Sequence, residues 1–323
     1  MTKVALIFGI SGQDGAFLAS LLISKGYEVH GTSRDAEINN FQSLIELEIK
    51  NLIEFHSVSL TDFRSVLRVI EKVAPNEIYN LSGQSSVGLS FEQPLETLES
   101  IAIATLNILE SMRFLGGDFH FYNASSSESF GDTGDFAANE ETPFNPKSPY
   151  GVAKASAFWQ VTNYRESYGL YACSGIMFNH ESYLRPQRFV TRKICNAAAR
   201  IALGSNEILK LGDISIKRDW GWAPEYVNAM WMMLQQEKAD DFVIATGHLN
   251  TLREFIRFAF SALDLNWEHY VTSNPELYRP SEIRSVYGSP KKANTKLNWI
   301  AKSKMPEVAK LMSLHQFKSL KDK

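Results

Sequence analysis

Short apolar runs alternate with longer amphipathic segments through the first half of the chain. The apolar runs, rich in branched residues, are 3–8, 28–31, 53–58, 77–80, 119–123 and 171–178. Helical periodicity marks the segments 15–24, 62–73, 95–114 and 150–168. Strands that alternate with helices form a parallel sheet covered on both faces. The pattern therefore predicts an α/β fold with a doubly wound parallel sheet.

The regular alternation ends near residue 178. Beyond it, 224–236 has the pattern of a helix and 241–245 that of a buried strand, which we expect to return to the sheet. A chain of 323 residues also exceeds the usual size of a single core. We therefore expect two domains. A Rossmann domain comprises 1–178 plus about 219–247, and a smaller C-terminal α/β substrate-binding domain comprises about 179–218 plus 248–323.

A glycine-rich turn follows the first predicted strand and opens the first predicted helix. Its glycines permit a tight turn and the close approach of a pyrophosphate to the helix N-terminus. The spacing is Gly-x-x-Gly-x-x-Gly rather than Gly-x-Gly-x-x-Gly, so a purely structural corner is the alternative. The predicted cofactor-binding residues of this turn are Gly9, Ile10, Ser11, Gly12, Gln13, Asp14 and Gly15.

The end of the second predicted strand indicates which dinucleotide is bound. NAD enzymes usually place a carboxylate there for the ribose 2′-hydroxyl, whereas this chain has Ser33 followed by Arg34. A guanidinium suits a 2′-phosphate, so NADP is favoured over NAD. The neighbouring Asp35 can partly offset Arg34 or bind a ribose itself, and an exposed arginine is the alternative.

A serine cluster with one carboxylate follows the fifth predicted strand, in the sequence NASSSESFG at 123–131. It places the hydroxyl of Ser126 and the carboxylate of Glu128 at the carboxyl end of the sheet, where ligands of this architecture bind. Glu128 is thus a candidate general acid or base. A serine cluster alone is more often an ordinary loop.

Tyr150 and Lys154 are four residues apart in a segment predicted to be helical. This spacing puts both on one face, where the ammonium of Lys154 favours the ionised form of the Tyr150 phenol. The pair would then supply a base near neutral pH. The same spacing occurs by chance in many helices, but together with Ser126 and Glu128 it predicts a catalytic set.

Composition and charge exclude several other classes of protein. The chain has 33 basic and 36 acidic residues with no basic run, so we expect no nucleic-acid partner. Its two cysteines, Cys173 and Cys195, have no paired spacing, so we expect neither disulfides nor a metal site. The apolar run 4–8 is too short for a signal sequence and no stretch is long enough to span a bilayer, which favours a cytoplasmic protein without membrane partners.

At these motifs the chain resembles the extended short-chain dehydrogenase/reductase superfamily. Further segments make it similar to the GDP-mannose 4,6-dehydratase family, and the resemblance runs from about residue 4 to residue 299. The segments that carry it are NPKSPYG at 145–151, FNHES at 178–182, FVTRK at 189–193, KRDWG at 217–221 and YRPSE at 278–282.

The resemblance implies an NADP-dependent hydro-lyase that converts a GDP-hexose to a GDP-4-keto-6-deoxyhexose and water by internal hydride transfer from C4 to C6. In such an enzyme Tyr150 takes the C4 hydroxyl proton and Glu128 removes the C5 proton and helps to expel the C6 hydroxyl. Ser126 hydrogen-bonds the C4 oxygen, and Lys154 orients the nicotinamide ribose and lowers the tyrosine pKa.

The resemblance also implies a set of binding residues. Besides the glycine turn, those expected at the cofactor are Arg34, Ser59, Leu60, Leu81, Gln84, Ser85, Tyr150, Lys154, His180 and Arg185. Those expected at the sugar nucleotide are Ser85, Ser126, Glu128, Asn179, Val190, Lys193, Arg218, Arg279 and Glu282.

The chain departs from the family pattern near the cofactor. Phe8 replaces a threonine at the start of the glycine turn, Ser59 stands where an aspartate commonly contacts the adenine, and 34–35 replaces paired arginines. The segment 184–186 replaces an Arg-Arg-Gly that contributes to tetramer contacts in the family. We expect a homodimer built on the helices 95–114 and 150–168, or a homotetramer.

Departures near the hexose leave the sugar open. Residues 82–83, 183–184 and 215–216 differ from the family pattern there, so GDP-N-acetylglucosamine and a GDP-heptose are alternatives to GDP-mannose. A sugar-nucleotide epimerase or reductase of the same fold is the alternative that changes the reaction.

Overall fold

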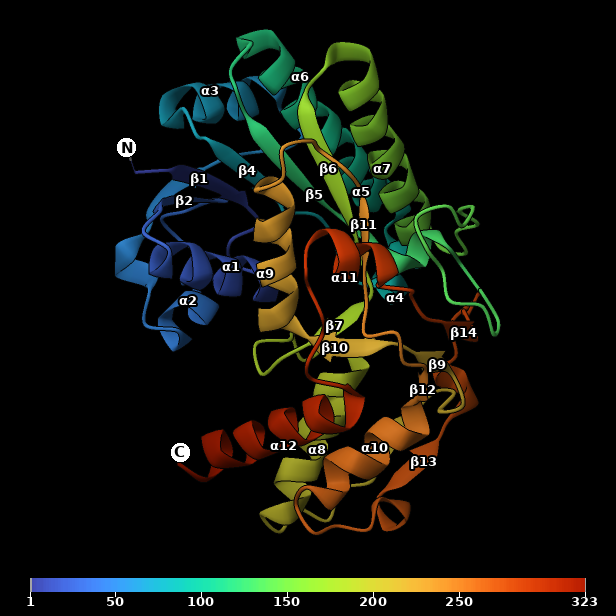
Figure 1. The fold of residues 1–323 in the computed structure, drawn as a ribbon. Coiled ribbons are helices and arrows are strands. Elements are labelled where there is room, and N and C mark those ends of the chain that lie inside the picture. The colour runs from blue at the N-terminus through green and yellow to red at the C-terminus, as the bar shows by residue number, and fades with distance from the viewer. Residues whose placement is uncertain (1, 323) are drawn as a thin grey trace.

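The structure, a computed structural model, describes residues 2–322. A seven-stranded sheet in the order β11-β6-β5-β4-β1-β2-β3 forms its centre, and every neighbouring pair is parallel (Figure 1). This confirms the doubly wound sheet, including its predicted seventh strand. The strands are β1 (Val4–Phe8), β2 (Glu28–Ser33), β3 (Glu54–Ser57), β4 (Glu77–Asn80), β5 (His120–Ser126), β6 (Tyr171–Met177) and β11 (Phe242–Ile244).

Helices cover both faces of the sheet because successive strand residues point to opposite sides. In β1, Ala5 and Ile7 belong to an apolar cluster with α1 (Gln13–Ser24) and α9 (Ala223–Leu234). The alternate residues, Leu6 and Phe8, belong to a cluster with the helices of the other face. Those helices are α3 (Phe63–Val73), α6 (Ala104–Leu115) and α7 (Pro149–Tyr168).

Several elements differ in extent from the sequence prediction. Strand β5 extends into the serine cluster and ends at Ser126. The helix expected at 95–114 is divided into α5 (Pro94–Leu98), a π-helical stretch (Glu99–Ile103) and α6. Helix α7 begins at Pro149, where the hydroxyl of Ser148 accepts a hydrogen bond from the backbone N–H of Gly151 at 3.0 Å. This cap fixes the start of the helix that carries Tyr150 and Lys154.

A second group of elements packs beside the carboxyl end of the sheet, in the lower part of Figure 1. Its apolar core lies between three helices, α8 (Val190–Ala202), α10 (Leu252–Ser261) and α12 (Met305–Lys321). Short strands accompany them: β7 (Asn179–Glu181) with β10 (Trp220–Trp222), β8 (Leu209–Leu211) with β13 (Val271–Ser273), and β9 (Lys217–Arg218) with β12 (Asn250–Thr251) and β14 (Ser285–Val286).

The remaining helices are short. They are α2 (Gln42–Glu46), α4 (Val87–Glu92) and α11 (Lys291–Lys296). Within residues 2–322, no helix is both long enough and apolar enough to cross a membrane.

Candidate active site

A cleft of about 520 Å³ opens at the carboxyl end of the central sheet and continues along the second group of elements. Its sheet side is lined by the loop after β4, the end of β5 and the first turns of α7. Its other side is lined by residues of β7, α8 and β9 and by the segment 277–282. All four predicted catalytic residues line it: Ser126, Glu128, Tyr150 and Lys154.

Lys154 is a buried ammonium held against the end of β5. Its Nζ donates a hydrogen bond to the carbonyl oxygen of Ala124 at 2.7 Å and lies 5.8 Å from the centre of the Tyr150 ring. Burial lowers the pKa of Lys154 to about 8, although the Asp14 carboxylate opposes this shift. An ammonium in this position can donate further hydrogen bonds to a ligand in the cleft.

The Tyr150 phenol is shielded from solvent, which disfavours its ionised form. Burial raises its pKa to about 12, and the Glu128 carboxylate adds to the increase. The largest opposing contribution comes from the hydroxyl of Ser126 rather than from Lys154. The pKa of Tyr150 is thus raised in this structure and not lowered as the sequence predicted, because desolvation of the phenol is the largest contribution.

Glu128 lies on the turn that follows β5, close to two cations. Its backbone N–H donates to the Ser126 hydroxyl at 3.3 Å, which fixes the turn. Burial raises the pKa of the Glu128 carboxyl, while Arg218 and Arg279 oppose the increase. A raised pKa makes this carboxyl a better proton acceptor than an exposed glutamate, and its protonated form can donate the proton again.

The substrate side of the cleft carries a cluster of cations. Arg218 is buried, and its guanidinium donates to the carboxylate of Glu282 at 2.9 Å and to the carbonyl oxygen of Ile283 at 2.7 Å. Arg279 shares the same Glu282 oxygen at 3.3 Å. With Lys193 in the same lining, these guanidiniums can donate charge-assisted hydrogen bonds to an anionic ligand. The remaining predicted substrate residues also line the cleft: Ser85, Asn179, Val190 and Lys193.

The glycine turn between β1 and α1 is packed too closely for side chains at two positions. A Cβ on Gly9 would lie 2.7 Å from the carbonyl oxygen of Leu81, and one on Gly15 would lie 2.4 Å from that of Gly9. A Cβ on Gly12 would meet only the Gly9 carbonyl oxygen, at 3.4 Å. Gly12 caps α1, and in the described chain no side chain caps this helix end. The open face at Gly12 and the uncapped N–H groups fit a pyrophosphate.

Asp14 and His180 connect the glycine turn to β7 at the edge of the cleft. The Nε2 of His180 lies 2.8 Å from the Asp14 carboxylate and its Nδ1 lies 2.6 Å from the carbonyl oxygen of Phe178. Nearby, the guanidinium of Arg185 pairs with Glu181 at 3.2 Å. Asp14, His180 and Arg185 all line the cleft, as do the predicted cofactor residues Leu81, Gln84 and Ser85.

Nine predicted cofactor residues lie outside the lining of the cleft: residues 9–13 and 15 of the glycine turn, together with Arg34, Ser59 and Leu60. Arg34 follows the end of β2, and Ser59 and Leu60 follow the end of β3. These strand ends share the sheet edge at which the glycine turn follows β1. The carboxylate of Asp35 accepts hydrogen bonds from the backbone N–H groups of residues 37 and 38, at 3.0 and 3.1 Å. Asp35 therefore stabilises its own turn.

The cleft also contains residues that the sequence reasoning missed. Among them are Arg188, Lys210, Asp213 and Tyr278. Tyr278 begins the quoted motif at 278–282, so proximity to that motif was an available signal. Lys210 and Asp213 belong to the irregular second half, where periodicity does not show which segments meet the sheet.

Comparison with known proteins extends this description. The sequence pattern of one family, described as GDP-mannose 4,6 dehydratase, matches residues 6–312. GDP-mannose 4,6 dehydratase 2 of Arabidopsis thaliana is 44% identical over 320 residues, which cover 96% of this chain and 86% of the relative. GDP-mannose 4,6-dehydratase of Yersinia enterocolitica is 42% identical over 340 residues, covering 95% and 91%.

Solved structures show the same fold at lower identity. dTDP-glucose 4,6-dehydratase from Bacillus anthracis, in complex with NAD, has a TM-score of 0.85 at 17% identity and covers 99% of this chain and 98% of its own. RMD from Pseudomonas aeruginosa, complexed with NADPH, has a TM-score of 0.83 at 20% identity and covers 98% and 100%. The fold is that of the extended short-chain dehydrogenases/reductases, and the match over nearly the whole sequence makes the chain a member of the GDP-mannose 4,6-dehydratase family.

Proposed function

We propose that this protein is a GDP-hexose 4,6-dehydratase that acts on GDP-mannose and yields a GDP-4-keto-6-deoxyhexose and water. One observation carries the proposal: Ser126, Glu128, Tyr150 and Lys154 line a single cleft. The cations Lys193, Arg218 and Arg279 line the same cleft. A reaction that removes water from a sugar held by a diphosphate needs both an acid/base set and an anion site.

Several residues are suited to hold a nicotinamide dinucleotide. The open face at Gly12 and the start of α1 would bind the pyrophosphate. The ammonium of Lys154 would hydrogen-bond the nicotinamide ribose, and His180 and Arg185 would bound the site from β7 and the loop after it. When bound, the nicotinamide ring supplies a reversible hydride acceptor next to the hexose.

The first proton transfer takes place at the C4 hydroxyl of the hexose. In its ionised form the Tyr150 phenol would accept the hydroxyl proton, while the Ser126 hydroxyl donates a hydrogen bond to the same oxygen. Because burial raises the pKa of the phenol, this form depends on positive charge beside it, from Lys154 and from the nicotinamide when bound. Loss of this proton and of the C4 hydride oxidises C4 to a ketone. The ketone makes the C5 proton acidic, which sets up the elimination.

Glu128 acts at C5 and C6. Its carboxylate removes the C5 proton, and the resulting carboxyl group protonates the C6 hydroxyl, which leaves as water. Burial, which raises the pKa of Glu128, supports both directions of transfer. The hydride removed from C4 would return to C6 while Tyr150 returns a proton at C5, so that C4 ends oxidised and C6 reduced with no net redox change.

NADP is the proposed cofactor, with NAD as the less favoured choice. Arg34 is exposed after β2, and the carboxylate that follows it is engaged by its own turn. The Asp35 oxygen is thus held by its own turn, and the Arg34 guanidinium suits a 2′-phosphate. Ser59 and Leu60 follow the adjacent strand and are proposed to contact the adenine.

We also propose the domain division, oligomeric state and compartment expected from the sequence. The separate apolar core of α8, α10 and α12 supports a C-terminal substrate-binding domain of about 179–218 plus 248–323; residues 1 and 323 lie outside the described residues. Exposed apolar side chains on the helices 94–115 and 149–168 support a homodimer or a tetramer of such pairs; they are Leu95, Leu98, Ile103, Val152 and Trp159. The proposed compartment is the cytoplasm.

Mass spectrometry without added reductant tests this proposal. Purified protein is incubated with NADP and, separately, with GDP-mannose, GDP-N-acetylglucosamine and a GDP-heptose. We expect loss of one water from GDP-mannose and a product that reacts as a ketone. Loss of water only from another GDP-hexose would show that GDP-mannose is not the substrate, while the proposed type of reaction would stand. A product of unchanged mass with an inverted centre would identify an epimerase and contradict the proposed reaction.

A further inference from the structure

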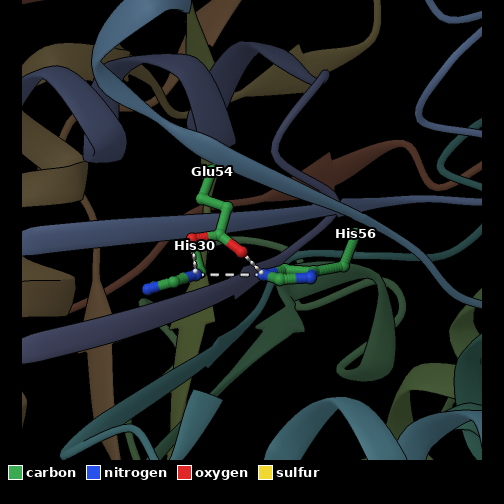
Figure 2. Close-up of side chains that lie close together, drawn as sticks. All are labelled: His30, Glu54 and His56. Atoms are coloured by element: carbon green, nitrogen blue, oxygen red, sulfur yellow. Dashed lines mark hydrogen bonds and ion pairs between the residues drawn. The ribbon is translucent and has the colours of Figure 1, made fainter. Parts of the chain in front are cut away.

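Two histidines and a glutamate come together at the edge of the central sheet, away from the cleft. His30 lies on β2, and Glu54 and His56 lie on the adjacent edge strand β3 (Figure 2). The parallel register pairs His30 with Glu54 and Thr32 with His56. All three side chains therefore lie on one face of the sheet. His30 and Glu54 are 24 positions apart in the chain, which is why no ligand spacing is visible in the sequence.

The ligating atoms converge on a single point. The Nδ1 of His30 lies 3.0 Å from the Nε2 of His56. The carboxylate of Glu54 lies 3.8 Å from the first of these nitrogens and 3.7 Å from the second. Ligands at about 2.1 Å from a tetrahedral zinc ion are about 3.4 Å from one another. We propose that His30, Glu54 and His56 bind one divalent transition-metal ion, with water or a further carboxylate as the fourth ligand.

A neighbouring carboxylate holds His30 in the tautomer that binding needs. The Nε2 of His30 lies 2.9 Å from the Glu28 carboxylate. When Nε2 donates its proton to Glu28, the lone pair of Nδ1 faces His56 and Glu54. Histidines that bind metals usually donate their other ring N–H to a carboxylate or carbonyl in this way. Glu28 is therefore a positioning residue.

Exposure and donor chemistry favour zinc. Both imidazoles are buried, whereas more than half of the Glu54 and Glu28 side chains is exposed. A metal ion could therefore reach the two buried nitrogens from the side on which the carboxylates are exposed to solvent. Two imidazoles and a carboxylate match Zn²⁺ better than Mg²⁺ or Ca²⁺, which prefer oxygen ligands. The Lys72 ammonium, 3.6 Å from the Glu54 carboxylate, competes with the metal for this ligand.

A bound ion would join the edge strand β3 to β2. Because β3 has a neighbouring strand on one side only, it is held by fewer backbone hydrogen bonds than the strands inside the sheet. An ion that binds only the folded chain stabilises it by RT ln(1 + [L]/Kd), so the free energy of unfolding rises with the concentration of free metal. The proposed site is thus structural and independent of the cleft.

Isothermal titration calorimetry of tag-free, chelator-treated protein with Zn²⁺ at about pH 7.5 tests the proposal, because it measures the affinity and the number of sites. We expect one site per chain and a higher melting temperature with Zn²⁺. Each of Glu54→Gln and His56→Gln should weaken binding more than about tenfold, since loss of even an outer-shell partner costs 10- to 100-fold. Lys72→Gln should tighten it. Glu54→Gln keeps the test valid if a histidine variant fails to fold, because the Glu54 side chain is exposed.

A matched control separates this site from adventitious binding by surface histidines. His269→Gln changes an exposed histidine and should leave the affinity unchanged. Replacement of Zn²⁺ by Co²⁺ should give the visible absorption of a tetrahedral ion in the parent protein and not in Glu54→Gln. Equal affinity in the parent and in Glu54→Gln and His56→Gln, or the absence of a saturable site, would overturn the proposal.

Discussion

The Nε2 of His180 and the carboxylate of Asp14 lie 2.8 Å apart, so one ion pair joins the first turn of α1 to β7. Although burial opposes the shift, the charge and hydrogen bond of His180 lower the pKa of Asp14 to about 2. Burial alone would lower the pKa of His180. The Asp14 carboxylate and the carbonyl of Phe178 outweigh this effect and raise the pKa above 6.5. The glycine turn and the second group of elements are thus electrostatically linked.

The pair should make stability depend on pH in a defined window. The Asp14 contribution is present above its ordinary pKa of 3.8 and is lost as the pH falls towards 2. The His180 contribution is present below 6.5 and is lost as the pH rises through its raised value. Asp14→Asn should therefore lower the free energy of unfolding by about 2 kcal/mol at about pH 5.5 and by less at about pH 9.

Urea unfolding at both pH values measures this difference. Glu37→Gln, a change at an exposed carboxylate, is the control and should shift neither midpoint. An equal loss of stability in Asp14→Asn at the two pH values would show that the pair does not account for it.

Replacement of Glu128 by glutamine should stop the elimination without unfolding the protein. The amide cannot accept the C5 proton, so kcat should fall by about 10²- to 10⁴-fold. Exchange of the C5 proton with deuterated solvent, followed by NMR, should stop as well. Glu141→Gln, at an exposed carboxylate outside the cleft, should keep full activity. Wild-type rates in Glu128→Gln would remove Glu128 from the mechanism.

Replacement of Arg279 should weaken substrate binding more than it slows chemistry. Arg279 is only partly buried and shares Glu282 with Arg218, so its loss leaves the Arg218 pair intact. Loss of one charge-assisted contact to a diphosphate costs about 1.5–3 kcal/mol, which predicts a KM for the GDP-sugar raised by more than about tenfold in Arg279→Gln. Steady-state kinetics should show a much smaller change in kcat than in KM. Arg284→Gln, a change outside the cleft, is the control and should leave both constants at the parent values.

Arg34→Ser should change the choice of cofactor. Loss of the guanidinium removes the partner proposed for the 2′-phosphate, so the Kd for NADP should rise and that for NAD should stay nearly constant. Fluorescence titration with both reduced cofactors measures the ratio, and Arg68→Ser provides an exposed arginine control. A similar rise for both cofactors would mean that Arg34 does not read the 2′-phosphate.

Local sequence patterns predicted the sheet and the candidate catalytic residues because both depend on neighbours in the chain, whereas the binding residues on the other side of the cleft came from the resemblance to a family. The i,i+4 spacing of Tyr150 and Lys154 and the serine cluster after β5 were visible in this way. Electrostatics were less predictable: the Tyr150 pKa depends on desolvation by residues from several elements, which spacing does not reveal. The convergence of His30 and His56 depends on strand register, which is equally hidden from the sequence.

The path of the hydride is the central claim, and isotope labelling tests it most directly. GDP-mannose carrying deuterium at C4 is incubated with the protein in ordinary water, and the product is analysed by NMR and mass spectrometry. We expect the deuterium in the new methyl group at C6, in the same sugar molecule. Formation of the 4-keto-6-deoxy product without that deuterium at C6 would contradict the account.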